Sequence, residues 1–314
     1  MDTPVLLIIF NRPDTTQKVF EAIRSIKPSK LLISADAPRS HKPDEAIKCQ
    51  HARAITEKID WDCEVYRQYA ETNLGCKHGP ISAINWAFSI VDEAIILEDD
   101  CIPNDAFFYF CNHFLRKYRH DHRVMQIAGT NLLDQWKSDR QDYHFSYSGC
   151  IWGWATWKRA WQYYDPDMKL LNNPEIQNRL NDVLTGQYEF SRRMLHWKTA
   201  IENKIDAWDY QWDFARFVQS GLCVVPSRNL VINLGFGHQD ATHTVKARKG
   251  LENQRMYDLS FPLKENPYLI VDRDYDRAIL PVILPKPNRL LHGLKKPLKV
   301  VFKFLPSGQY QEAT

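Results

Sequence analysis

Three consecutive carboxylates, Glu98, Asp99 and Asp100, directly follow the apolar run at residues 94–97. At neutral pH such neighbours repel one another unless a cation neutralises them. Mn²⁺ or Mg²⁺ binds one or two carboxylates and completes its coordination shell with phosphate oxygens of a substrate. The alternative is the acidic start of a helix beginning near Asp105. The position of the triplet at the end of a strand favours the metal site.

Polar residues also follow the other apolar runs of the N-terminal third. Asn11 and Arg12 come after the run at 4–10, and Asp36 comes after the run at 31–35. In open parallel sheets, ligands bind beyond the carboxyl ends of the strands. One polar residue after a strand is usually part of a turn, but this repeated pattern indicates a binding edge.

These residues must be positioned by alternating strands and helices. The predicted strands lie at 4–10, 31–35, 63–66 and 94–97, and segments with helical spacing lie between them at 14–26, 43–59 and 80–91. Such alternation predicts βαβ units and a parallel sheet. The sequence has neither G-x-G-x-x-G nor a P-loop motif, so a metal and side chains would have to hold any nucleotide phosphates.

Composition excludes several classes of protein. The 314 residues carry 41 Lys and Arg against 38 Asp and Glu, and a net charge of +3 is too small to indicate nucleic-acid binding. No apolar run approaches the ~20 residues that span a bilayer. The seven cysteines are scattered without a C-x-x-C pair, which argues against a disulfide framework or a zinc site. We therefore expect a cytoplasmic protein.

Several segments together resemble nucleotide-diphospho-sugar transferases of GT-A fold. They are LLIIFNRPD, ISADAPR, NLGCKHGPISAINWAF, IILEDDCIPNDAFFYF, IWGWATWKRAW and NLGFGHQDATHT, within residues 3–245. The chain is most similar to bacterial family 2-like glycosyltransferases and more distantly similar to the N-acetylglucosaminyltransferase I group. The resemblance implies an α/β, Rossmann-like fold with a mostly parallel central sheet flanked by helices and a helical acceptor-side insertion.

The resemblance also implies roles for individual residues. Asp100 would coordinate Mn²⁺, Asp99 would approach the ribose and Glu98 the transferred sugar. Asp36 would receive the uracil edge of a uridine nucleotide, while Asn11 and Arg12 would face the nucleotide, with Arg12 toward its phosphates.

The second half supplies candidates for the acceptor side. Trp152 and Trp154 flank Gly153 in an aromatic segment, 151–164, which is either a wall of the sugar site or the start of a helix packed on the sheet. Asp209 follows Trp208, and the N-acetylglucosaminyltransferase group has its base at a comparable place. Asp209 is therefore the candidate base, with Asp206 and Asp213 as alternatives.

Two further segments, the glycine-containing loop at 233–243 and the C-terminal tail, contain candidate contacts. His243, or alternatively His238, would contact the metal or diphosphate, and Asp240 is a weaker candidate. In the tail at 285–303, lysines are interspersed with leucines. This pattern suits peripheral contact with the anionic inner face of a membrane, or else a packing helix or a subunit contact.

The sequence predicts a metal-dependent, inverting glycosyltransferase. Its donor would be a nucleotide-diphosphate sugar, with UDP-N-acetylhexosamine as one candidate, and its acceptor a glycan or lipid-linked hydroxyl in cell-surface polysaccharide assembly. We expect a nucleotide-sugar-binding half at 1–130, an acceptor-side and catalytic half at 131–250, and a C-terminal extension at 251–314. The alternatives are a sugar nucleotidyltransferase and a non-catalytic sugar-nucleotide-binding accessory protein.

Overall fold

A computed structural model of the chain describes residues 1–236, 251 and 254–286. Residues Met1–Leu284 form one compact unit, and Pro285–Thr314 form a second. Most of the tail at 285–303 lies outside the described residues. In the part of the chain that is described, every helix is too short or too polar to cross a bilayer.

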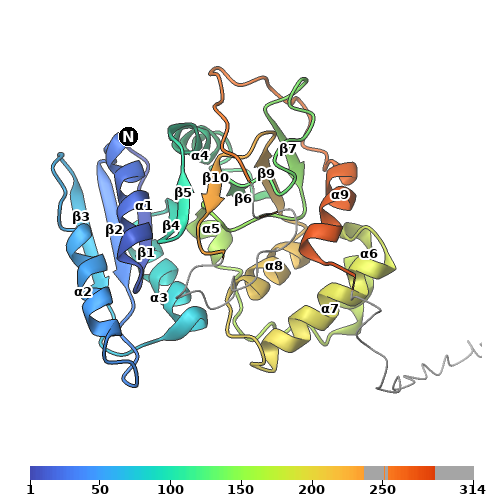
Figure 1. The fold of residues 1–314 in the computed structure, drawn as a ribbon. Helices are drawn as coiled ribbons and strands as arrows, with labels where there is room; N and C mark the ends of the chain where they lie inside the picture. Colours follow the sequence, from blue (N-terminus) through green and yellow to red (C-terminus); the bar gives the residue numbers. More distant parts are fainter. Residues whose placement is uncertain (237–250, 252–253, 287–314) are drawn as a thin grey trace, which may run out of the picture. The chain divides into compact units, whose positions relative to one another are not determined.

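The centre of the first unit is a mixed sheet, eight-stranded among the described residues (Figure 1). Its strands lie in the order β3 (Glu64–Tyr69), β2 (Lys30–Ala35), β1 (Val5–Ile9), β4 (Glu93–Glu98), β8 (Trp154–Trp157), β6 (Val124–Ala128), β9 (Leu222–Pro226), β7 (Tyr143–Ser146). Only β8 and β7 run antiparallel to the other strands of this sheet. The expected α/β architecture with a mostly parallel sheet is therefore confirmed.

Helices cover both faces of the sheet because its strands are apolar on both sides. One face packs against α1 (Pro13–Ile26), α2 (Glu45–Ile55) and α4 (Asp105–Lys117). The other packs against α3 (Gly75–Ile90), α5 (Lys158–Trp161) and α8 (Asp209–Val218). Strand β1 serves both cores, since Leu7 faces the first and Leu6 the second.

The expected helical insertion follows β8. Helices α6 (Pro174–Val183) and α7 (Gln187–Ile201) form an apolar cluster with α8, built around Trp197, Phe214 and Phe217. Helix α9 (Arg273–Ile283) supplies Tyr275 and Ile279 to a cluster that includes Val225 of β9. The insertion and α9 lie on the same side of the molecule in Figure 1.

The sheet changes its direction of growth between β1 and β4. Strands β2 and β3 extend it on one side of β1, and β4 lies on the other. In the pairing of β1 with β4, Ile8 lies opposite Glu98, so these two strands end at the same level. Such a switch point is the usual ligand site of an open α/β sheet. Residues 10–12 and 98–100 follow these two strand ends.

Several segments differ from the sequence expectation: β3 ends three residues later than predicted, and α2 ends four residues earlier. Residues Trp154–Trp157 form the central strand β8, not the start of a helix. Helix α3 begins at Gly75, several residues before the predicted start at 80, and contains Pro80. Beside β4, β5 (Cys101–Pro103) pairs antiparallel with β10 (Val231–Asn233) and so brings the C-terminal part of the chain to the acidic triplet.

Candidate active site

The acidic edge, which we define as Glu98, Asp99 and Asp100, lies at the end of β4 beside Arg12. The Nη1 atom of Arg12 is 2.5 Å from Oδ2 of Asp100 and 3.3 Å from Oδ1 of Asp99. Burial lowers the pKa of Arg12, but the charges of Asp99 and Asp100 outweigh it and raise the pKa overall. The structure thus brings together Arg12 and the two aspartates, from opposite sides of the switch point.

Backbone contacts fix both aspartates. The N–H group of Phe10 donates to Oδ2 of Asp99 at 3.0 Å. The N–H group of Leu234, just after β10, donates to the carbonyl of Asp100 at 2.8 Å. The thiol of Cys101 donates to Oδ1 of Asp100 at 3.3 Å. Both carboxylates are therefore held at the edge, and neither is a solvated surface group.

These oxygens are chemically suited to a divalent cation. Carboxylates are hard ligands, and Mg²⁺ and Mn²⁺ bind through one or two of them together with substrate phosphates. In the described ranges, no group of three His, Cys, Asp or Glu side chains converges as a metal site. A cation at Asp100 would have to share or replace the contact with Arg12.

Glu98 is the residue of the acidic edge that lies at the last position of β4. Its pKa lies well above the usual range, mainly because it is buried and secondarily because Asp100 and Asp99 repel its ionised form. Arg12 opposes this shift, and the charge of Asp209 adds to it. A protonated Glu98 can donate a hydrogen bond to a sugar hydroxyl, which an ionised carboxylate cannot.

Asn11 faces away from the acidic edge toward a residue that sequence reasoning missed. Its Nδ2 atom donates to Oε1 of Glu45 at 2.9 Å, and the backbone N–H group of Arg39 donates to Oε2 at 2.8 Å. Burial raises the pKa of Glu45, but hydrogen bonds from Arg39 and Asn11 outweigh it and lower the pKa to about 2. Glu45 lies at the start of α2, 34 residues after Asn11, and no sequence pattern indicates that the two side chains meet.

Asp36 joins two loops at the end of β2. Its Oδ1 atom accepts from the N–H groups of Ala37 and Leu74, each at 2.8 Å, and its Oδ2 atom accepts from Gly75 N–H at 2.9 Å. Asn73 Nδ2 also donates to Oδ2 at 3.1 Å. Burial is the main cause that raises the pKa of Asp36, and these amides oppose it. Its carboxylate therefore fixes the start of α3, and a contact with uracil stays a prediction.

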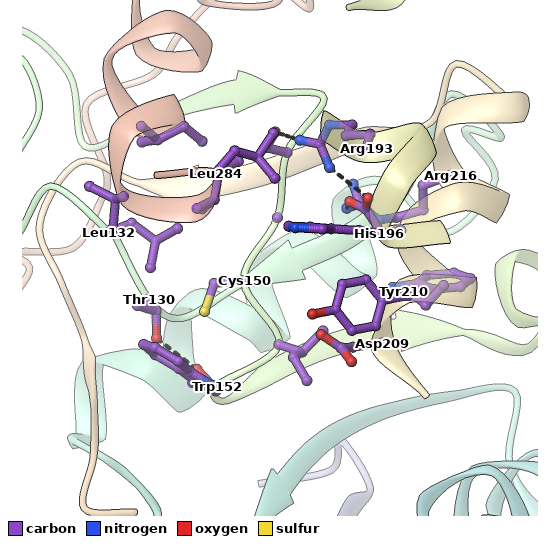
Figure 2. A pocket seen from close by; sticks show the side chains of 18 of the residues that line it. Thr130, Leu132, Cys150, Trp152, Arg193, His196, Asp209, Tyr210, Arg216 and Leu284 are labelled. Atoms are coloured by element: carbon purple, nitrogen blue, oxygen red, sulfur yellow. Dashed lines mark hydrogen bonds and ion pairs between the residues drawn. The ribbon is translucent and has the colours of Figure 1, made fainter. Parts of the chain in front are cut away.

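Asp209, the candidate base, begins α8 and lies at a cavity of about 190 Å³. Figure 2 shows Asp209 and Tyr210 on one side of this cavity and Thr130 and Trp152 on the other. The negative charge of Asp209 contributes to the raised pKa of Glu98 and of Tyr164. Asp209 thus lines the cavity, and its charge acts on Glu98 of the acidic edge.

The two alternative bases occupy different surroundings. Asp213 accepts from Arg193 Nη1 at 2.6 Å and from Trp197 Nε1 at 3.3 Å, and also pairs with Arg216. This ion-pair network engages its carboxylate. Asp206 is exposed at the N-terminus of α3, where its Oδ2 atom would lie 3.2 Å from a Cβ built on Gly75. Of the three aspartates, only Asp209 both lines the cavity and influences the acidic edge.

The two tryptophans that flank Gly153 lie in different surroundings. Trp154 is fully buried and packs against Trp161, Trp208 and Trp212, because it lies on central strand β8. Trp152, just before the strand, lines the cavity. Ile96 of β4 pairs with Trp154 of β8 in the antiparallel direction. Two residues further toward the carboxyl end of β4, Glu98 and Trp152 therefore lie at the same edge of the sheet.

His243, with His238 and Asp240, lies outside the described residues. The chain reaches this segment through β10, which pairs with β5 directly after Asp100. The predicted contact of His243 with a metal therefore stays a prediction.

Comparisons with known proteins give weak structural likeness. No family model and no curated protein sequence matches the chain. Among solved structures, it is similar to TarS of S. aureus, residues 1–349, with 11% identity, a TM-score of 0.37, and coverage of 75% of this chain and 61% of that chain. A second TarS structure gives 10% identity, a TM-score of 0.36, and coverage of 74% and 36%.

A third likeness is to 4-diphosphocytidyl-2C-methyl-D-erythritol synthase from Anaerococcus prevotii. It has 11% identity, a TM-score of 0.28, and coverage of 40% of this chain and 54% of that chain. The chain thus spans less than two thirds of each of these proteins. Function must be argued from the side chains of this chain.

Proposed function

We propose that this protein is a glycosyltransferase of the GT-A type that transfers a sugar from a nucleoside-diphosphate donor to a hydroxyl acceptor. The observation that carries the proposal is the acidic edge at the switch point, where Arg12 pairs with Asp99 and Asp100. Ligands of open α/β sheets bind at this place. A UDP-sugar is the donor favoured by the sequence resemblance, and UDP-N-acetylhexosamine is one candidate.

The donor would lie across the carboxyl ends of β1 and β4. Asp100 would hold Mn²⁺ or Mg²⁺, which supplies Lewis-acid stabilisation of the leaving diphosphate when bound, and Asp99 would approach the ribose. Arg12 is the cationic side chain beside them and would bind the phosphate oxygens. Glu98, whose pKa is raised, would donate a hydrogen bond to the sugar and fix its orientation.

The acceptor would enter from the cavity beside Asp209. This cavity has apolar and aromatic walls that include Trp152, Tyr210 and Ile151, which suit the faces of a sugar ring. Its volume of about 190 Å³ is enough for a single ring. Asp209 would accept the proton of the acceptor hydroxyl as that oxygen attacks the anomeric carbon, with inversion.

Calorimetric titration with a panel of sugar nucleotides, with and without Mn²⁺, tests the proposal most directly. We expect one donor to bind with Mn²⁺ and much more weakly without it. Asp100→Asn should abolish this dependence and transfer while the circular dichroism spectrum stays unchanged. Asp142→Asn, in the connection before β7, is a matched control and should behave like the unmodified protein.

Two outcomes would favour the alternatives. If the protein binds a donor but neither transfers the sugar nor slowly hydrolyses the donor, it is an accessory protein. Formation of a sugar nucleotide from a nucleoside triphosphate and a sugar phosphate would indicate a nucleotidyltransferase. Binding of no sugar nucleotide at any Mn²⁺ concentration would refute the proposed function.

A further inference from the structure

Arg12 makes both of its ion pairs through one nitrogen. Nη1 contacts Asp100 at 2.5 Å and Asp99 at 3.3 Å. Among the described residues, Nε and Nη2 have no hydrogen-bond acceptor, although the guanidinium has five N–H groups. The side chain is 15% exposed, so part of the guanidinium remains open to a ligand.

The backbone of Arg12 is fixed, while its side chain is not enclosed. Its carbonyl accepts from the N–H group of Thr16 at 2.9 Å and from the Thr16 hydroxyl at 2.7 Å. Pro13 is the first residue of α1 and fixes the direction of the chain after Arg12. Movement at this position is therefore a change of side-chain rotamer and needs no change in the fold.

Both carboxylate oxygens of Asp100 already have hydrogen-bond partners. The Oδ1 atom accepts from the thiol of Cys101 and the Oδ2 atom from Arg12. A divalent ion binds a carboxylate oxygen at roughly 2.1 Å. On Oδ2 it would meet the positive charge of Nη1 at close range, and the two would repel strongly in this buried setting. A metal ion that binds Oδ2 of Asp100 would therefore displace Arg12 from this oxygen.

We infer that Arg12 and the divalent cation exchange at the acidic edge. In the free protein Arg12 neutralises Asp99 and Asp100. When a cation binds Asp100, the guanidinium turns away and binds the diphosphate of the donor, so that metal and nucleotide binding strengthen each other. The inference rests on the proposed function for the nucleotide step, but the exchange itself concerns only Arg12, the two aspartates and the metal.

Two variants with opposite effects test this exchange. Arg12→Met removes the internal cation and should bind Mn²⁺ alone more tightly than the unmodified protein, measured by electron paramagnetic resonance of unbound Mn²⁺. Arg12→Lys keeps a competing charge and should bind Mn²⁺ alone like the unmodified protein. Arg24→Met removes an exposed arginine of α1 and should leave Mn²⁺ binding unchanged.

Added UDP, with GDP and ADP in parallel, tests the second half of the exchange. In the unmodified protein the matching nucleotide should tighten Mn²⁺ binding by about 5- to 150-fold, within the usual range of coupling between sites. This gain should shrink in Arg12→Met and in Arg12→Lys, because neither side chain provides the forked N–H groups for a diphosphate. Arg12→Lys alone carries the test should Arg12→Met fail to fold.

The inference is overturned if Arg12→Met binds Mn²⁺ no more tightly than the unmodified protein. It is also overturned if the full nucleotide gain persists in Arg12→Lys. A different result, tighter Mn²⁺ binding by Arg12→Met with no nucleotide bound by any form, would support the competition and refute the proposed function. The two failures are thus distinguishable.

Discussion

At the scale of single residues, the site separates three aspartates of similar sequence context by their partners. Asp209 lines the cavity and adds to the raised pKa of Glu98, whereas Asp213 is engaged by Arg193 and Arg216. Asp206 is exposed near the start of α3. Sequence spacing puts all three within one short segment, and only the tertiary contacts tell them apart.

The first prediction concerns Asp209→Asn. The amide keeps the size of the side chain but cannot accept the acceptor proton, so transfer should fall by about 10²- to 10⁴-fold. Donor binding measured by calorimetry should stay within the error of the unmodified protein. Unchanged transfer in this variant would show that another group acts as the base.

A second prediction concerns the pH dependence of stability at Glu98. Its folded pKa is raised, so above its unfolded value of about 4.3 the folded state holds a proton that the unfolded state has lost. Stability therefore falls as pH rises toward the folded pKa. Glu98→Gln removes this penalty, and its Tm should decline less between about pH 5 and about pH 8 than that of the unmodified protein.

Exposed Glu57, just after α2, provides the control for this measurement. Glu57→Gln should reproduce the pH profile of the unmodified protein. Parallel profiles for all three proteins would contradict a raised pKa at Glu98.

At the scale of elements, the sequence predicts strands better than it predicts helix starts. Strands β1, β2 and β4 lie within one residue of their predicted bounds, because each is a short apolar run between polar residues. Helix α3 starts earlier than predicted, at Gly75, and continues past Pro80. Tertiary contacts override local propensity here, since Asp36 accepts from the N–H groups at the helix start.

The same limits apply to the site. Arg12 and the acidic edge could be predicted to meet, because parallel strand ends share one edge of the sheet. The role of Glu45 could not, because it depends on a contact between α2 and the segment after β1. Trp154 could not be placed either, because WATW suits a strand and a helix alike until the antiparallel pairing of β8 with β4 is known.

Gly153 lies directly before β8 and adopts a left-handed backbone conformation, which gives a third prediction. Its φ is +64°, and an added Cβ would lie 2.8 Å from Cγ2 of Val231. Gly153→Ala should therefore reduce the free energy of unfolding by about 1–3 kcal/mol. Gly79→Ala in α3, where the Cβ would meet Asp36 at an ordinary 3.6 Å, should be neutral or slightly stabilising in the same urea titration.

At the scale of the whole molecule, buried charges join the helical insertion to the sheet. Arg193 of α7 pairs with Glu189 and Asp213 and donates to the hydroxyl of Ser148, which follows β7. Arg216 of α8 donates to the carbonyl of Tyr147. Both arginines also line the cavity beside Asp209. The wall of the proposed acceptor site is therefore part of the structural connection between the helical insertion and the sheet.

Asp213→Ala is the prediction that follows from this network. The substitution leaves the buried guanidiniums of Arg193 and Arg216 without a shared carboxylate, and loss of one partner of a buried ion pair costs about 3–5 kcal/mol. The free energy of unfolding in urea should fall by that amount, whereas Asp182→Ala on the exposed face of α6 should have little effect. Because the proposed donor site is the acidic edge and not the ion-pair network of Asp213, Asp213→Ala should still bind the donor at temperatures below its Tm. A variant with full stability would show that the insertion is held by its apolar cluster alone.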